Sequence, residues 1–227
     1  MRSLMHFLSS GRFALISLCF LIWILPAACM QTSYSEISDA PQRTNFFDRS
    51  VEFKLYREFF QFAPECVVIS IRSSHAINPV SLLIARSFER YLRDKIKKVI
   101  GLRHAVKLSR KIGVSLDYQE DRIIFANLSK CSFLAEIEIR RIEDTFLFIW
   151  ANRSIDLNFQ LLCLLTGKTL FKSSHTAKRG NGGIPLSAYA MPISLAQAAK
   201  VTGDREIFLS LADDAARRML KPLPDLR

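Results

Sequence analysis

The stretch 131–175 constrains the fold more than any other part of this 227-residue chain. Apolar and polar side chains alternate over Phe133–Ile142 and again over Ile155–Leu165. Successive side chains of a strand point to opposite faces, so each segment predicts a strand with one buried and one solvated face. Thr166-Gly167-Lys168 predicts a hairpin turn into the strand Thr169–Ser174, because Gly supplies the backbone freedom that such turns need. The stretch predicts an antiparallel meander.

Two further signals subdivide the meander. Phe146–Trp150 is apolar on both sides, which is typical of a central strand covered on both faces. Asp144 and Asn152-Arg153 are turn-forming residues on either side of it, so we expect the chain to turn there.

The preceding part of the chain alternates one strand with several helices. Cys66–Arg72 is a compact apolar strand, and Asn78-Pro79 is typical of a helix start. Further expected elements are a helix from there to Gly101, helices over Arg103–Ile112, Asp121–Leu128, Ser194–Lys200 and Asp204–Leu220, and either a helix or a strand within Val51–Phe62. The pattern predicts an α+β fold with an antiparallel-rich mixed sheet of three to five strands packed with helices.

The first 28 residues have the features of a secretory signal peptide. Arg2 and Arg12 provide positive charge, Phe13–Leu25 is almost wholly hydrophobic, and small residues precede Cys29. The hydrophobic stretch is shorter than the roughly 20 residues that span a bilayer, although an uncleaved N-terminal anchor is the alternative. We therefore expect a leader over residues 1–28, a flexible tether over 29–50 and a single domain over 51–227.

Cys29 resembles the acylated cysteine of a bacterial lipobox, where it would become the new N-terminus. The sequence departs from the usual pattern because Pro26 occupies the place in which Leu is favoured. Met30 rather than Asp follows the cysteine, which for such lipoproteins implies the outer membrane, facing the periplasm. Two or more acyl chains anchor a protein stably. Plain secretion into the periplasm is the alternative.

A strong positive charge narrows the range of partners. The chain carries a formal charge of +11, and loss of Arg2 and Arg12 with the leader leaves +9. Such a surface favours anionic lipid, polyanionic cell-wall polymer or nucleic acid. Export argues against nucleic acid, so we expect none.

Three cysteines follow Cys29, at positions 66, 131 and 163. An odd number cannot pair completely, and we expect buried free thiols. A Cys131–Cys163 or Cys66–Cys131 disulfide is the alternative in an oxidising periplasm. The absence of a C-x-x-C motif removes support for a zinc or thioredoxin-type site.

A glycine-rich segment is the only candidate binding loop. Arg179, Gly180, Gly182 and Gly183 would present backbone N–H groups to an anion or a partner, or would simply form a turn. Gly167-Lys168-Thr169 is no phosphate-binding P-loop, because Leu162 stands where that motif requires Gly and a strand follows instead of a helix.

No catalytic or metal-binding constellation is recognisable. His75, His104 and His175 lie in unrelated contexts without ordered ligand spacing. Glu136 and Glu138 form a carboxylate pair of the kind glycosidases use, but alternation assigns both to the solvated face. Asp213-Asp214 is likewise interpreted as solvated. We predict no catalytic residue, no metal and no cofactor.

Taken together, these residues resemble periplasmic lipoproteins that share the fold of the TolB N-terminal domain. That group includes the curli secretion lipoprotein CsgG, penicillin-binding-protein activator lipoproteins and neisserial-type surface lipoproteins. The resemblance covers roughly Val67–Ser174. Its signals are Lys130-Cys131-Ser132-Phe133-Leu134 before an apolar strand and the hairpin Leu161–Phe171, in which Phe171 replaces a frequent Trp.

The resemblance implies an adaptor or assembly factor rather than an enzyme. We therefore expect a non-catalytic lipoprotein that is anchored in the envelope through Cys29 and acts with an envelope protein complex. Self-association is left open. The alternative is a soluble periplasmic protein that binds or hydrolyses an anionic or cell-wall ligand. The positive charge and Arg179 favour this alternative.

Overall fold

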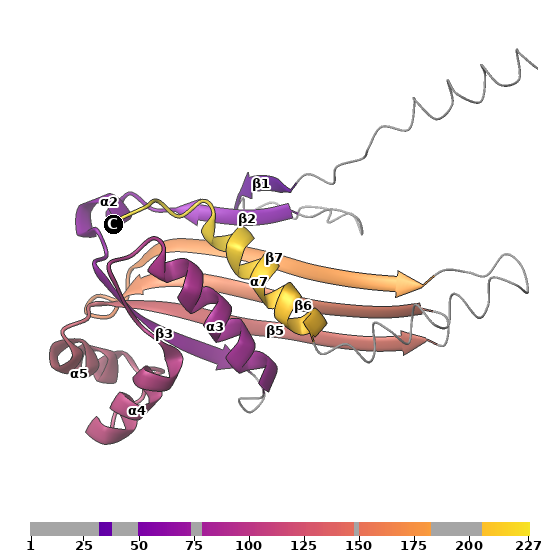
Figure 1. The fold of residues 1–227 in the computed structure, drawn as a ribbon. Coiled ribbons are helices and arrows are strands. Elements are labelled where there is room, and N and C mark those ends of the chain that lie inside the picture. The colour runs from indigo at the N-terminus through magenta and orange to yellow at the C-terminus, as the bar shows by residue number, and fades with distance from the viewer. Residues whose placement is uncertain (1–31, 38–49, 74–78, 148–149, 183–205) are drawn as a thin grey trace, which may run out of the picture. The chain divides into compact units, whose positions relative to one another are not determined.

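Seven strands form one mixed sheet in the order β1-β2-β7-β6-β5-β3-β4 (Figure 1). The computed structural model describes residues 32–37, 50–73, 79–147, 150–182 and 206–227, and these belong to the unit Thr32–Arg227. The strands are β1 (Ser33–Glu36), β2 (Ser50–Leu55), β3 (Cys66–Ser73), β4 (Lys98–Ile100), β5 (Phe133–Leu147), β6 (Trp150–Cys163) and β7 (Thr169–Gly182). The helices are α2 (Glu58–Phe62), α3 (Pro79–Arg93), α4 (Leu102–Ile112), α5 (Gln119–Ser129) and α7 (Glu206–Leu220). The predicted α+β class and antiparallel-rich mixed sheet are confirmed, with more strands than expected.

The antiparallel meander β5-β6-β7 is longer and simpler than predicted. The predicted turns at Asp144 and at Asn152-Arg153 are wrong, because Asp144 pairs with Arg153 and Thr145 with Asn152 inside the β5–β6 ladder. A bulge lies earlier in β5, between Ile139 and Arg141. Arg140 is the extra residue of the bulge and has no partner in the ladder. Ile142 therefore returns to the covered face and packs against the core. The hairpin at Gly167, with φ of 69°, is confirmed.

Parallel pairing completes the sheet on one side of the meander. β3 runs parallel to both β5 and β4. The helix that begins at Pro79 ends at Arg93 rather than Gly101, and Lys98–Ile100 forms β4 instead. Here Val99 and Ile100 pair with the apolar residues Val67 and Val68, so strand pairing overrides the helical periodicity of the sequence.

Strand pairing also involves residues that were assigned to the tether. Ser33–Glu36 forms β1, parallel to β2, so the expectation of a flexible tether is wrong for these residues. The undecided segment Val51–Phe62 contains both the strand β2 and the short helix α2. The helix expected over Ser194–Lys200 lies outside the described residues.

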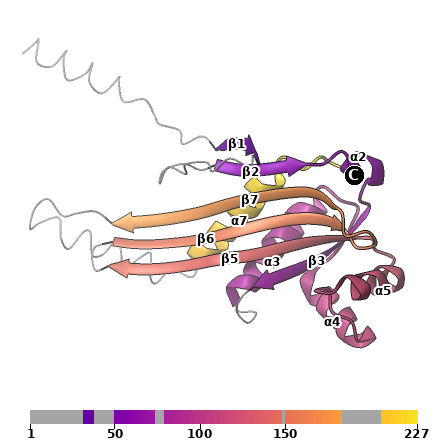
Figure 2. The same ribbon diagram turned by 180° about the vertical axis from the view of Figure 1, so that it is seen from behind.

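Helices cover the two faces of the sheet unequally. α3 and α7 cover one face and share a core with Ile69, Phe159 and Phe171 (Figure 1). On the other face, α4 and α5 pack in a smaller cluster around Val68, Leu134 and Leu162. Figure 2 shows β5, β6 and β7 uncovered by described helices over most of that second face. None of the helices within the described ranges is long and apolar enough to span a membrane.

Candidate functional site

A polar cavity lies on the open face of the sheet, across β2, β7, β6 and β5. Its volume is about 300 Å³. Its lining includes charged, amide and hydroxyl side chains from alternate positions of these strands, namely Glu52, Lys172, Ser174, Asn158, Gln160, Glu136 and Glu138. Alternation places all of them on one face, so the strands themselves set the spacing of these groups. The cavity therefore presents both hydrogen-bond donors and acceptors.

A buried carboxylate forms one side of this cavity. Glu136 is only 3% exposed, and its Oε1 lies 2.8 Å from Nη2 of Arg72 and 3.3 Å from Nη2 of Arg122. Gln160 donates a hydrogen bond from Nε2 to the other carboxylate oxygen. A buried charge is costly unless opposite charges and hydrogen bonds compensate it, and here three different elements supply them. The group is therefore an organised ion cluster that joins β3, α5 and β6.

The prediction of a solvated Glu136–Glu138 pair is wrong for Glu136. Arg122 of α5 reaches over the strand, and its Nε also donates to the carbonyl of Leu116 at 2.6 Å. Glu138 is half-buried and accepts a hydrogen bond from Nδ2 of Asn158 at 2.8 Å. Alternation in one strand reports which face a residue lies on, but not whether a distant helix covers that face.

The cavity has the chemistry of a binding site. Glu136 faces two guanidinium groups, and Arg72, which is 49% exposed, is held by it near the cavity. Within the described part of the chain, no group of three or more His, Cys, Asp or Glu side chains is arranged to hold a metal. The lining groups are suited to a polar or charged ligand.

The predicted glycine-rich loop is largely strand. Arg179, Gly180 and Gly182 pair with Arg153, Asn152 and Trp150 in the β6–β7 ladder, so their backbone does not form the expected anion-binding loop. Arg179 donates a hydrogen bond from Nη1 to Oγ of Ser210 in α7 at 3.0 Å. Gly183 lies outside the described residues. Anion or partner binding at these positions stays a prediction without the loop geometry that motivated it.

One histidine, His175, is buried in the sheet. His175 of β7 lies with Nδ1 at 2.8 Å from the carbonyl oxygen of Ser50, so Nδ1 carries the proton in the neutral ring. Burial lowers the pKa of His175 from its ordinary value of 6.5, although the carbonyl of Ser50 and the carboxylates of Asp214 and Asp156 oppose the shift. The neighbouring Arg218 adds to the lowering.

The pKa of His175 predicts a loss of stability in mild acid. Below about pH 6.5 the unfolded chain binds a proton that the buried ring does not, so stability falls until the pH reaches the lowered pKa of the folded state. We expect His175→Gln to reduce this pH dependence between pH 7.5 and 5.5. Urea denaturation at several pH values measures it, and an unchanged pH dependence in the variant would contradict the assignment.

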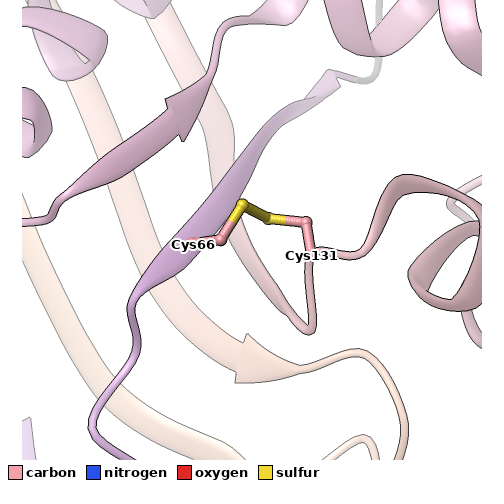
Figure 3. The surroundings of a disulfide bond; sticks show 2 residues. All are labelled: Cys66 and Cys131. Atoms are coloured by element: carbon pink, nitrogen blue, oxygen red, sulfur yellow. A yellow bond between two sulfur atoms is a disulfide. The ribbon is translucent and has the colours of Figure 1, made fainter.

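A disulfide joins Cys66 to Cys131 (Figure 3). The expectation of three free thiols is therefore wrong, whereas Cys163 is free and buried as predicted. Val67 of β3 pairs in parallel with Phe133 of β5, which brings Cys66 at the start of β3 to a Cα–Cα distance of 5.2 Å from Cys131, just before β5. The sequence signal was the position of both cysteines directly before apolar strands, but the parallel pairing was not predictable from periodicity.

Comparisons with known proteins return likeness in structure only. No family model and no curated protein sequence matches the chain. A PelC dodecamer from Paraburkholderia phytofirmans is 12% identical, with 77% of this chain and 97% of that chain covered and a TM-score of 0.45. Lipoprotein GNA1162 from Neisseria meningitidis is 9% identical, with 62% and 100% covered and a TM-score of 0.45. The LpoB C-terminal domain from Salmonella enterica is 12% identical, with 50% and 82% covered and a TM-score of 0.35.

Bacterial lipoproteins thus stand among the solved structures that this α+β chain is similar to. The narrower likeness to the TolB N-terminal domain and to CsgG stays a prediction.

Proposed function

We propose that the protein is an exported lipoprotein, acylated at Cys29, that acts without catalysis as an adaptor in a cell-envelope complex. The Cys66–Cys131 disulfide carries the proposal. Structural disulfides persist in oxidising compartments such as the periplasm and are rare in the reducing cytosol. A leader over residues 1–28, with small residues before Cys29, provides the route to that compartment.

The open face of the sheet is suited to binding a partner, which an adaptor must do. Its cavity offers carboxylates, amides and a lysine on a rigid frame of four strands, and Glu136 locks that frame to α5 through Arg122. Such a surface recognises a polar partner by hydrogen bonds and charge. Cross-linking in intact cells, followed by identification of the linked chains, will show whether the partner is another envelope protein or a second copy.

Acylation at Cys29 predicts a specific result in cells. Radioactive palmitate should label the wild-type protein and place it in the outer-membrane fraction, because two or more acyl chains anchor it stably. Cys29→Ser should abolish the label and release the protein from the membrane fraction. Cys163→Ser is the matched control and should keep both, since that thiol is buried in the domain. An unlabelled wild-type protein that stays soluble would refute the anchor.

A further inference from the structure

The described domain begins very close to the proposed lipid anchor. Only Met30 and Gln31 separate Cys29 from Thr32, the first described residue. A fully extended chain spans at most about 3.6 Å per residue, so Thr32 stays within roughly 11 Å of an acylated Cys29. The anchor therefore limits which side of the domain can approach the bilayer.

Thr32 is fixed to the rest of the domain. Arg218 of α7 donates a hydrogen bond from Nη1 to Oγ1 of Thr32, and Asp214 holds Arg218 through an Nε–Oδ2 contact of 2.8 Å. The next four residues form β1, the strand at one edge of the sheet, which pairs with β2. The start of the domain is therefore held in a fixed position by α7 and β2. An anchor at Cys29 would bring these neighbouring elements close to the membrane together with Thr32.

Cations predominate beside this point. Arg217 is 62% exposed in the last turn of α7, and its Nη2 lies 2.8 Å from Asp214. Lys221 is exposed and lies with Nζ 5.3 Å from the ring centroid of Tyr34 in β1. Together with Arg218, these residues give three positive charges against the one negative charge of Asp214, while Glu36 lies at the other end of β1. Arg218 itself is buried beneath them, so we call Thr32, Tyr34, Arg217 and Lys221 the anchor surface.

We propose that the anchor surface lies against anionic lipid headgroups of the membrane that holds Cys29. The inference rests on the acylation of Cys29 in the proposed function. Lysine and arginine next to a negatively charged leaflet are attracted to it over about a Debye length, and the short connection keeps them within that range. The opposite edge of the sheet, β4, is six strand spacings away, or about 29 Å, so it and the neighbouring α4 project away from the bilayer.

Single-cysteine fluorescence tests the orientation in the acylated, full-length mature protein. Ser33→Cys places a probe in β1, and Asn127→Cys places a matched probe on α5, at a position that is also exposed and lies toward the opposite edge. The native cysteines do not compete for the label, because Cys66 and Cys131 are bonded and Cys163 is buried. The quenchers are nitroxides on the headgroups of phosphatidylglycerol-containing vesicles.

Quenching at Ser33 should exceed quenching at Asn127 several-fold. Replacing Arg217 and Lys221 together by Gln should reduce that ratio about twofold by allowing the domain to tilt, whereas the control pair Lys107→Gln and Arg110→Gln on α4 should not. A vesicle-bound protein with equal quenching at both probes would overturn the orientation while leaving the anchor intact. A ratio insensitive to Arg217 and Lys221 would overturn the headgroup contact. A protein that does not float with the vesicles would overturn the anchor itself and this inference with it.

Discussion

Replacing Cys66 and Cys131 together by Ala is expected to lower the free energy of unfolding by about 4 kcal/mol. The bond connects residues 65 positions apart, and closing a loop of that length removes much of the conformational entropy of the unfolded chain. It also joins two strands that pair in parallel, whose long connection makes their association slow and entropically costly. Chemical denaturation of wild type and variant under non-reducing conditions measures the difference.

Reducing agent provides the matched control for the disulfide. It should destabilise the wild-type protein to a similar extent and leave the Cys66→Ala/Cys131→Ala variant almost unchanged. Cys163→Ala should retain full sensitivity to the reductant, because the thiol of Cys163 forms no bond to another cysteine. Equal stability of the wild type and the double variant before reduction would show that the bond is not formed in the native protein.

Glu136→Gln is expected to lower the free energy of unfolding by about 3 kcal/mol. The substitution keeps the size of the side chain but removes the charge that compensates Arg122, of which only about a tenth is exposed. Removing one partner of a buried ion pair leaves the other charge uncompensated, and such changes typically cost 3–5 kcal/mol. We take the lower end because Arg72 is half-exposed and can turn to solvent.

Glu138→Gln is the control for this prediction, two residues along the same strand. Glu138 is half-buried and has the amide of Asn158 as its hydrogen-bond partner, so its loss should cost about 1 kcal/mol or less. Urea denaturation of both variants at neutral pH gives the comparison. Glu136→Gln with an effect no larger than that of Glu138→Gln would contradict the ion cluster and remove the reason for regarding the open face as a rigid binding frame.

Much of the fold was predictable where one face of an element is buried. Alternation located the strands of the meander, Pro79 marked the start of α3, and the helix expected over Arg103–Ile112 corresponds to α4. The short strands β1 and β4 were missed because their pairing partners are distant in sequence. Asp144 and Asn152 were misread as turns because local turn propensity cannot detect that their two segments pair with each other in the β5–β6 ladder.

The candidate site was less predictable than the fold. The sequence singled out Glu136 and Glu138 as a pair, but alternation assigned both to solvent. The assignment failed for Glu136 because Arg72 and Arg122 reach it from other elements. Arg179 and its glycines suggested a loop, whereas strand pairing with β6 uses the backbone groups of Arg179, Gly180 and Gly182. Both errors have one physical origin: periodicity describes a segment by itself, and a binding surface depends on what packs around it.

The intact mass of the protein, purified from its native cells under non-reducing conditions, reports export, acylation and the disulfide in one measurement. We expect a chain that begins at Cys29, carries acyl chains there, and is two hydrogens lighter than its fully reduced form. An unmodified chain that begins at Met1 with five free thiols would contradict export, anchor and disulfide together.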